Sequence, residues 1–293
     1  MPVLEPNVAQ PVKSSAAVQR IGCVSFLNAR PLIAGLENLD GSSNLAVDYH
    51  VPSHLLAQLE SRCVDIALCP IIDFYASKEP LELVPVGGIG CCGPTLTVKL
   101  CSRVPFNQIK QVYVDADSHT SVALLQIVLS QRYGTRPHII TRCVGQSEEE
   151  STTFAQAEAV LFIGDKVVTC RPSTDEFAFQ LDLGEAWHGL TQLPFVFAAW
   201  MSHADSNLGK LPALLSITKQ QNLNQINQIA ITYATEHGWP ADLASRYLGQ
   251  LLCYDIGPKQ IQAIKLFADH AKTLGLIDEA VPLRIRSQIP QKV

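Results

Sequence analysis

The sequence is short of charged residues and holds no cluster of Lys and Arg. Its 293 residues include 22 Lys and Arg against 27 Asp and Glu, and charged residues make up 17% of the chain. Contacts to phosphates need a basic face, so this composition argues against DNA and RNA as partners. No stretch approaches the roughly 18 consecutive apolar residues of a transmembrane helix, so no membrane partner is predicted.

The sequence signatures of cofactor and metal chemistry are also missing. There is no GxGxxG, GxxxxGK(S/T), GxSxG or HExxH motif, which leaves nucleotide binding, P-loop chemistry, α/β-hydrolase catalysis and HExxH-type zinc proteolysis without support. None of the nine cysteines forms a CxxC motif. We therefore expect no cofactor and no metal.

The cysteines mostly lie in apolar runs, as Cys69 does, which is typical of small buried side chains in a reducing compartment. The adjacent Cys91 and Cys92 are either a redox or metal pair or part of a buried glycine-rich loop. The absence of a second Cys/His cluster nearby in the sequence favours the loop. Residues 1–18 lack the apolar stretch of roughly 7 to 15 residues found in secretory signals, so we expect a disordered leader and a cytoplasmic protein.

Short apolar runs alternate with helical patterns through the first two thirds of the chain, and the last ~90 residues are helical in pattern. Strands are expected at 21–25, 45–50, 64–69, 111–115, 138–141, 159–163 and 195–200, and helices at 29–39, 53–61 and 119–132. This order predicts an α/β protein of two lobes with a ligand cleft between them. We assign residues 19–104 and 199–293 to lobe 1 and residues 105–198 to lobe 2.

The first candidate site follows a predicted strand, in the segment SFLNARPL. Ser25 and Asn28 stand where a helix is expected to begin, so either they bind a ligand or they only cap that helix. Arg30 is not a capping residue. An arginine beside a helix N-terminus adds donors suited to a carboxylate, so we expect it to bind substrate.

The second candidate is DADSHTSVALL, where hydroxyl side chains open a predicted helix. Ser118, Thr120 and Ser121 form an expected anion cradle, because a single cap needs only one hydroxyl. His119 lies among them and is either an acid or base titrating near neutral pH or a solvated surface residue.

A third candidate pairs the strand GPTLTV with the strand end IGDK. Thr97 supplies a hydroxyl, and Gly164 and Asp165 follow a buried run at the edge where open α/β sheets bind ligands. Each is weak alone, because Thr97 also suits an ordinary strand and Asp165 an ordinary surface ion pair.

Four segments, SFLNARPL, DADSHTSVALL, AVLFIGDK and DLGEAWHGLTQLPFVFAAW, occur in an order and spacing that resemble the chorismate dehydratases of the futalosine route to menaquinone. The resemblance runs from about Arg20 to the C-terminal helices. It implies a periplasmic-binding-protein type II fold used as a cytoplasmic enzyme. The implied reaction removes water from chorismate and yields 3-[(1-carboxyvinyl)oxy]benzoate.

The resemblance also implies catalytic roles for two residues. The family asparagine of the first motif falls on Asn28, and the cleft serine falls on Thr97, where threonine keeps the hydroxyl but adds a methyl group. Gln192 stands where the family commonly has glycine, a change expected to affect only a turn. The elimination needs orientation and modest proton transfer, and the proton acceptor is left open among His119, Asp165 and the substrate's own carboxylate.

Two alternatives to this function are kept. A sister enzyme that forms 1,4-dihydroxy-6-naphthoate shares the expected fold, but SFLNARPL argues against it. A solute-binding protein without catalysis is also compatible with the fold, because a fold does not determine a function. In each case the expected partner is a small molecule, which for the favoured function is chorismate, and the oligomeric state is not predicted.

Overall fold

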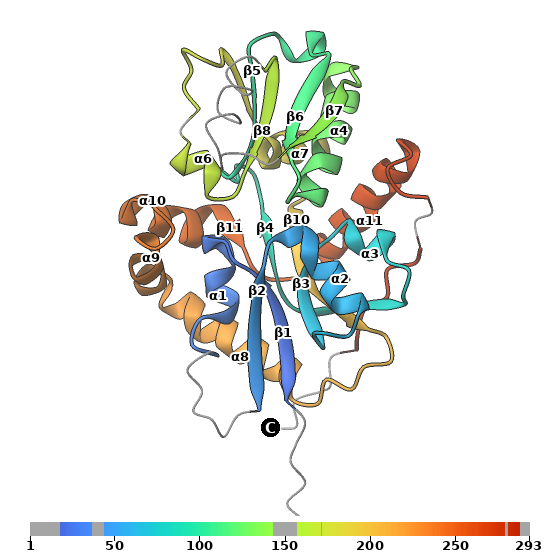
Figure 1. Ribbon diagram of the computed structural model, residues 1–293, viewed down its shortest axis with the longest axis vertical. Helices are drawn as coiled ribbons and strands as arrows, with labels where there is room; N and C mark the ends of the chain where they lie inside the picture. The colour runs from blue at the N-terminus through green and yellow to red at the C-terminus, as the bar shows by residue number, and fades with distance from the viewer. Residues whose placement is uncertain (1–17, 37–43, 143–156, 171, 279–280, 288–293) are drawn as a thin grey trace, which may run out of the picture.

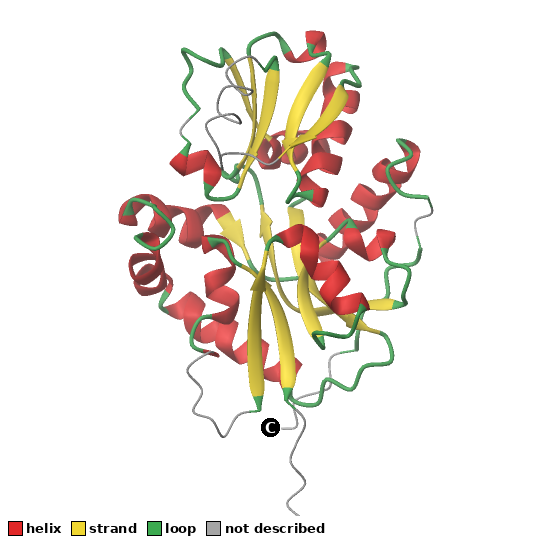
Figure 2. Cartoon of the chain, in the orientation of Figure 1, coloured by secondary structure: helices red, strands yellow, loops and turns green. Residues whose placement is uncertain are grey.

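The computed structural model describes residues 18–36, 44–142, 157–170, 172–278 and 281–287 (Figure 1). The predicted leader therefore lies almost wholly outside the described residues. Within the described chain the strands form two separate sheets, one above the other in the view of Figure 2, with helices around both.

The first sheet has six strands in the order β11-β4-β10-β3-β1-β2. Their bounds are β1 Gln19–Val24, β2 Leu45–His50, β3 Ile66–Pro70, β4 Leu81–Cys91, β10 Phe195–His203 and β11 Leu252–Cys253. β1 pairs in parallel with β2 and β3, as the alternating pattern predicts. β10 returns from far along the chain and lies antiparallel between β3 and β4.

Short helices follow the strands of this first sheet. They are η1 Leu27–Ala29, α1 Arg30–Ile33, η3 Pro52–His54, α2 Leu55–Glu60 and α3 Asp73–Ala76. The helix expected at 29–39 is much shorter than predicted. Ala34 turns extended and Gly35 takes a φ of +90°, a conformation that ends the helix after one turn.

The second sheet has five strands in the order β7-β6-β8-β5-β9. Its elements are β5 Val98–Ser102, β6 Gln111–Asp115, β7 His138–Arg142, β8 Ala159–Ile163 and β9 Phe179–Asp182, with helices η4 Phe106–Gln108, α4 His119–Tyr133, α6 Lys166–Thr169 and α7 Leu183–Thr191. The predictions for 111–115, 138–141 and 159–163 are confirmed. Gln192 ends α7 with a φ of 58°, a left-handed turn of the kind that favours glycine.

The C-terminal section packs on the first sheet and reaches toward the second (Figure 1). It comprises α8 Leu211–Asn224, α9 Ile226–Ala234, α10 Ala241–Arg246, a π-helical turn η5 at Tyr247–Leu251 and α11 Pro258–Thr273. These helices confirm the helical pattern expected for the last ~90 residues, and they pack inward through Ala230 on α9 and Ile264 and Ala268 on α11, which are buried.

The chain crosses between the sheets twice, before β5 and before β10. Strand pairing divides the chain differently from the boundaries expected above. Val98–Ser102 belongs to the second sheet, although lobe 1 was expected to run to residue 104, and β10 joins the first sheet from Phe195, ahead of the expected return at 199. The first crossover turns at Gly93 and Leu96, which have φ values of +117° and 68°.

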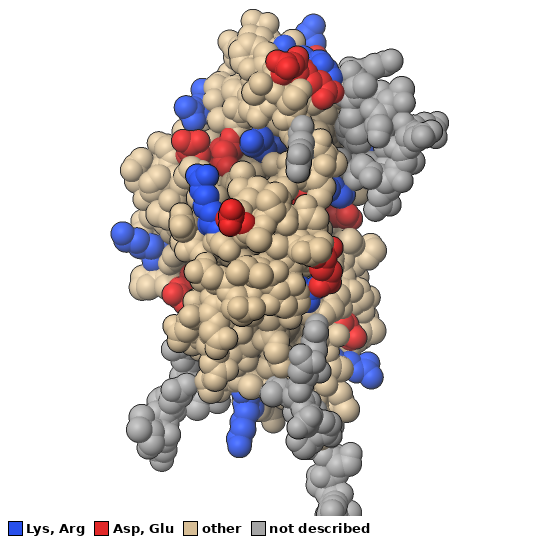
Figure 3. All heavy atoms as spheres, turned by 90° about the vertical axis from the view of Figure 1, so that its left-hand side faces the viewer, with Lys and Arg blue, Asp and Glu red and all other residues tan. Residues whose placement is uncertain are grey.

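Surface charge is sparse and mixed. On the face shown in Figure 3, Lys and Arg side chains are scattered among Asp and Glu, and large areas between them are uncharged. This face offers no continuous basic stripe of the kind that binds nucleic acid.

Candidate functional site

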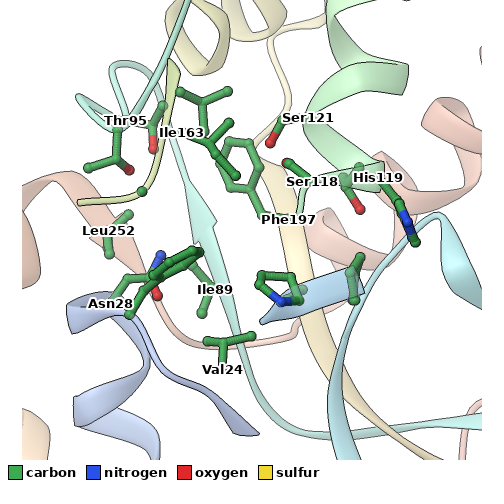
Figure 4. Close-up of a pocket in the computed structure, with 18 of the residues that line it drawn as sticks. Val24, Asn28, Ile89, Thr95, Ser118, His119, Ser121, Ile163, Phe197 and Leu252 are labelled. Atoms are coloured by element: carbon green, nitrogen blue, oxygen red, sulfur yellow. The ribbon is translucent and has the colours of Figure 1, made fainter. Parts of the chain in front are cut away.

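A pocket of about 580 Å³, counted with its opening to solvent, lies between the two sheets. Both lobes contribute to it, as Figure 4 shows, with Asn28 and Val24 on one side and Thr95, Ser118 and Ser121 on the other. Its lining residues are Val24, Phe26, Asn28, Pro52, Pro70, Ile89, Thr95, Thr97, Val98, Ser118, His119, Thr120, Ser121, Ile163, Gly164, Phe197, Ala198, Tyr247 and Leu252. Apolar walls with a few converging polar groups are typical of small-molecule sites.

Asn28 reaches the pocket from η1. It does not cap a helix, because α1 begins at Arg30 behind Ala29, which carries no side-chain cap, and η1 has Phe26 at its N-cap. The carbonyl oxygen of its side chain is buried and has no hydrogen-bond partner among the residues that the structure describes. A buried unpaired acceptor facing a pocket is costly unless a ligand satisfies it, so the capping alternative is wrong and the ligand-binding interpretation is favoured.

Thr97 lies on the opposite wall, at the end of the first crossover. Its hydroxyl is buried 2.8 Å from the hydroxyl of Tyr247, which begins the π-helical turn. Asn28 also hydrogen-bonds to this tyrosine, and burial raises the pKa of Tyr247 while both hydrogen bonds lower it. The two residues predicted to be catalytic are therefore joined through a neutral phenol.

The loop that carries Thr97 is held by the carboxylate of Asp182. This carboxylate accepts from the backbone amides of Thr95 and Leu96 at 2.7 to 3.0 Å. It also caps α7 by accepting from the amides of Gly184 and Glu185. The first residue of the DLGEAWHGLT motif thus fixes the position of the loop that bears Thr97.

The predicted anion cradle opens α4 at the pocket. Ser118 is the N-cap residue by position, yet its side chain makes no capping hydrogen bond, so its hydroxyl is available to the pocket. Ser121 is buried and also lines the pocket. Thr120 differs, because its hydroxyl accepts from the backbone amide of Ile72 at 3.3 Å. The free amides of a 15-residue helix and the serine hydroxyls suit an anion.

His119 is the first residue of α4 and lies at the edge of the pocket (Figure 4). Its Nδ1 is 2.8 Å from Oδ1 of Asp73, which is 2% exposed at the start of α3. The hydrogen bond to Asp73 raises the pKa of His119, against the opposing effect of burial. Asp73 therefore holds the His119 ring in place, although the histidine side chain is 44% exposed.

Two of the residues predicted to bind substrate lie outside the pocket lining. Arg30 extends between the rings of Tyr49 and Tyr233, with its guanidinium carbon 5.0 and 4.7 Å from their centroids, and it pairs with Glu236 at 3.2 Å. The short helix α1 offers no anion site beside it. Ser25 extends the β1–β2 pairing through its amide, which donates to His50.

Asp165 is also absent from the lining. Its two oxygens accept from Nδ1 of His237 and Nε1 of Trp239, each at 2.8 Å, so it joins the second lobe to the C-terminal helices. Trp239 in turn stacks on Tyr247 with ring centroids 4.8 Å apart. These contacts give Asp165 a structural role at this junction, and the sequence could not show the distant partners that it meets; that it binds substrate stays a prediction.

Gly164 does line the pocket, with a φ of +58°. A Cβ there would meet the ring of Phe26 at 3.2 Å, so glycine permits the two lobes to approach. Its amide donates to the carbonyl of Thr97, which places Gly164 in the wall of the site.

Sequence reasoning missed Tyr247 and Asp73 as site residues. Tyr247 lies in a helical region whose pattern indicated only core packing, and Asp73 follows a buried strand without any recognisable motif. The one sequence signal for Asp73 was its place as a polar residue just after a buried strand, where open α/β sheets bind ligands.

No helix in the described ranges is long and apolar enough to cross a bilayer. No three metal-ligating side chains are grouped to hold a metal within the part of the chain that the structure covers. Cys91 is buried, with its pKa raised by that burial, whereas Cys92 is exposed.

Two lobes with a small-molecule pocket between them define the periplasmic-binding-protein class of fold. The fold is shared by protein AF1704 from Archaeoglobus fulgidus, with a TM-score of 0.69, 13% identity and coverage of 88% of this chain and 98% of the other. It is also shared by the periplasmic aliphatic sulphonate binding protein SsuA from Escherichia coli, with a TM-score of 0.62, 16% identity and coverage of 94% and 96%. These similarities show the fold alone.

Sequence comparison identifies the family within this class. Residues 19–273 match the family described as menaquinone biosynthesis, so the chain belongs to that family. A curated Thermus thermophilus protein named chorismate dehydratase is 26% identical over 271 residues, which cover 87% of this chain and 95% of that protein.

Proposed function

We propose that this protein is a chorismate dehydratase, a lyase that removes water from chorismate to give 3-[(1-carboxyvinyl)oxy]benzoate at the start of the futalosine route to menaquinone. The family membership and the Thermus relative support this function. The observation that carries it is the meeting of Asn28 and Thr97 at the buried hydroxyl of Tyr247, on the wall of a pocket between the lobes.

The pocket suits a dianion with an apolar ring. Chorismate has one ring carboxylate and one enolpyruvyl carboxylate. Ser118 and Ser121, with the first amides of α4, supply donors on one side of the pocket. Ile89, Phe197 and Leu252 supply apolar walls for the ring between the two polar sides.

The reaction breaks one carbon–oxygen bond and one carbon–hydrogen bond. The ring hydroxyl leaves, the neighbouring carbon gives up its proton, and the electron pair of that bond completes an aromatic ring, so the products are the benzoate and water. Asn28 cannot act as a base, because its amide does not titrate usefully. Its Oδ1, unpaired within the described residues, can accept from the ring hydroxyl, its amide N–H donates to the departing hydroxyl or to a carboxylate, and Thr97 is the second donor.

Tyr247 orients these two donors. Its raised pKa keeps the phenol neutral, so it exchanges hydrogen bonds with Thr97 and Asn28 without adding charge beside a dianion. Asp165 is a weaker choice for the proton acceptor, because it lies outside the pocket lining and its two oxygens accept from His237 and Trp239. His119 and the substrate's own carboxylate remain as acceptors.

The proposal includes a cytoplasmic location. The eight cysteines in the described ranges are free thiols, which is typical of proteins in a reducing compartment. A small-molecule substrate is the only partner that the proposed reaction needs.

The test is to incubate the purified chain with chorismate and follow absorbance and mass. Loss of water with formation of the aromatic product is the expected result. Chorismate that is bound but returned unchanged would show a solute-binding protein and contradict the proposal.

A further inference from the structure

Charge is scarce at the walls of the pocket. Among the described lining residues there is no Lys, Arg, Asp or Glu, and His119 is the one side chain that can carry a positive charge. Moving a carboxylate from water into such surroundings is strongly unfavourable unless a donor or cation compensates it. The site proposed above takes a substrate with two carboxylates, so the source of the compensating charge matters.

His119 is held by a residue of the other lobe. It begins α4 beside the second sheet, whereas Asp73 begins α3 beside the first, and Nδ1 and Oδ1 are 2.8 Å apart. The histidine side chain is 44% exposed and the aspartate is 2% exposed. Within the described ranges the second oxygen of Asp73 is buried without a hydrogen-bond partner, so His119 is the group there that satisfies this carboxylate.

The contact with Asp73 determines which nitrogen of the imidazole is free to bind a ligand. An ionised carboxylate can only accept, so Nδ1 carries a proton and donates it to Asp73, which leaves Nε2 for a ligand. Asp117, in the turn before α4, also raises the pKa of His119, and Lys166 lies 3.8 Å from Asp117 and offsets part of its charge. Burial raises the pKa of Asp73, the hydrogen bond and the charge of His119 lower it, and the negative charge of Glu60 on α2 raises it.

We propose that protonated His119, held by Asp73, binds one carboxylate of the substrate as the cationic anchor of the pocket. The inference rests on the proposed function for the identity of the anion. The imidazolium donates from Nδ1 to Asp73 and from Nε2 to the substrate, so one ring pairs with a carboxylate of the first lobe and with a carboxylate of the ligand. A protonated ring cannot also accept the proton lost in the elimination.

This arrangement predicts a pH-dependent affinity with a definite sign. The anchor needs the charged ring, so affinity for chorismate is full below the pKa of His119 and falls as pH rises through it. A change of kcat is not expected from the anchor itself, because a carboxylate contact present in both the ground state and the transition state affects KM.

The central variant is His119→Gln, which keeps a hydrogen-bonding side chain but removes the charge. It should raise KM and the dissociation constant for chorismate about tenfold or more, since one charge-assisted hydrogen bond is lost, and it should flatten the pH dependence of affinity. The matched control is His138→Gln, an exposed histidine on β7, which should keep the wild-type affinity and pH profile.

Two further variants test the charges of His119 and Asp73. His119→Arg carries a permanent charge, so it should restore affinity and make it independent of pH over the same range. Asp73→Asn still accepts a hydrogen bond from Nδ1 but removes the negative charge, so it should move the loss of affinity to lower pH. Melting temperatures of all variants distinguish weaker binding from loss of fold.

Three results would overturn the anchor. They are unchanged affinity and pH profile in His119→Gln, a fall in kcat with constant KM, which would make the histidine an acid or base, and an Arg variant no better than Gln. Calorimetry with chorismate keeps this question separate from the reaction. Wild-type protein that binds chorismate with the stated pH dependence but forms no product would contradict the proposed function and leave the anchor standing.

Discussion

The hydroxyl of Thr97 lies 2.8 Å from the hydroxyl of Tyr247, although 150 residues separate them in the sequence. Thr97 belongs to a loop tied to α7 of the second lobe through Asp182, and Tyr247 belongs to the C-terminal helices. Asn28, from the first lobe, bonds to the same phenol. Three distant segments of the chain thus meet at a single buried oxygen.

The first prediction concerns this phenol. Tyr247→Phe removes the common partner of Asn28 and Thr97, so kcat should fall about tenfold or more as the donors lose their orientation, with a smaller change in KM. The free energy of unfolding should fall by about 1–3 kcal/mol, because the buried partners of the hydroxyl are left without a hydrogen bond. Steady-state kinetics and denaturant titration measure the two effects.

The matched control for Tyr247 is Tyr254→Phe. Tyr254 is also buried, but its hydroxyl has no hydrogen-bond partner in the part of the chain that the structure describes, so removing it should leave both activity and stability near wild type. Equal effects of the two substitutions would contradict a positioning role for Tyr247.

The second prediction concerns Asn28. Asn28→Ala should lower kcat about a hundredfold or more, as loss of one preorganised donor does. Asn28→Asp should be inactive as well, because it replaces the donor with a charge beside a dianionic substrate. The control is Asn207→Asp, on an exposed turn where either side chain can accept from the amide of Gly209. Turnover by Asn28→Asp near the wild-type rate would end the catalytic assignment.

The third prediction divides the hydroxyls at the start of α4. Ser121→Ala should weaken chorismate binding about tenfold without lowering the melting temperature, since a hydrogen bond to a charged ligand group is lost. Thr120→Ala should instead lower stability, because its hydroxyl accepts from the amide of Ile72. Calorimetry and thermal unfolding distinguish the two, with Ser130→Ala at the far end of the helix as control. Unchanged affinity in Ser121→Ala would remove it from the cradle.

The fourth prediction concerns the contact between Asp165 and Trp239. Trp239→Phe keeps an aromatic ring over Tyr247 but deletes the indole N–H that donates to the carboxylate, so stability should fall by about 1.5–3 kcal/mol from that bond alone. Asp165→Asn should be destabilising as well, whereas Asp175→Asn on the exposed surface should not. Denaturant midpoints measure these effects, and a stable Asp165→Asn protein with impaired binding alone would favour a ligand-binding aspartate.

The parts of the site that depend on local sequence patterns could be predicted from the sequence. Strands at 111–115 and 159–163 were predictable from buried runs, and the residues after them were expected at the ligand edge because the ends of neighbouring strands meet there. Thr120, Ser121 and Gly164 do line the pocket for that reason.

Two residues expected to bind substrate lie outside the pocket lining for a different reason. Arg30 and Asp165 also follow strands, but the residues that occupy them, Glu236 for the first and His237 and Trp239 for the second, come from helices far along the chain. A local pattern gives the position of a side chain on its own element and does not give the distant group that it meets. The same limit explains why Tyr247 was overlooked.

The insertion of β10 between β3 and β4 has a consequence for the order of folding during synthesis. β5 to β9 form a contiguous segment that can pair as soon as it is made, whereas the register of Ala198 with Pro70 and Ile89 closes the first sheet only after that segment has been translated. Tyr247 emerges later still. A ribosome-bound chain therefore holds a folded second lobe beside an unfinished first sheet, and its pocket is completed last.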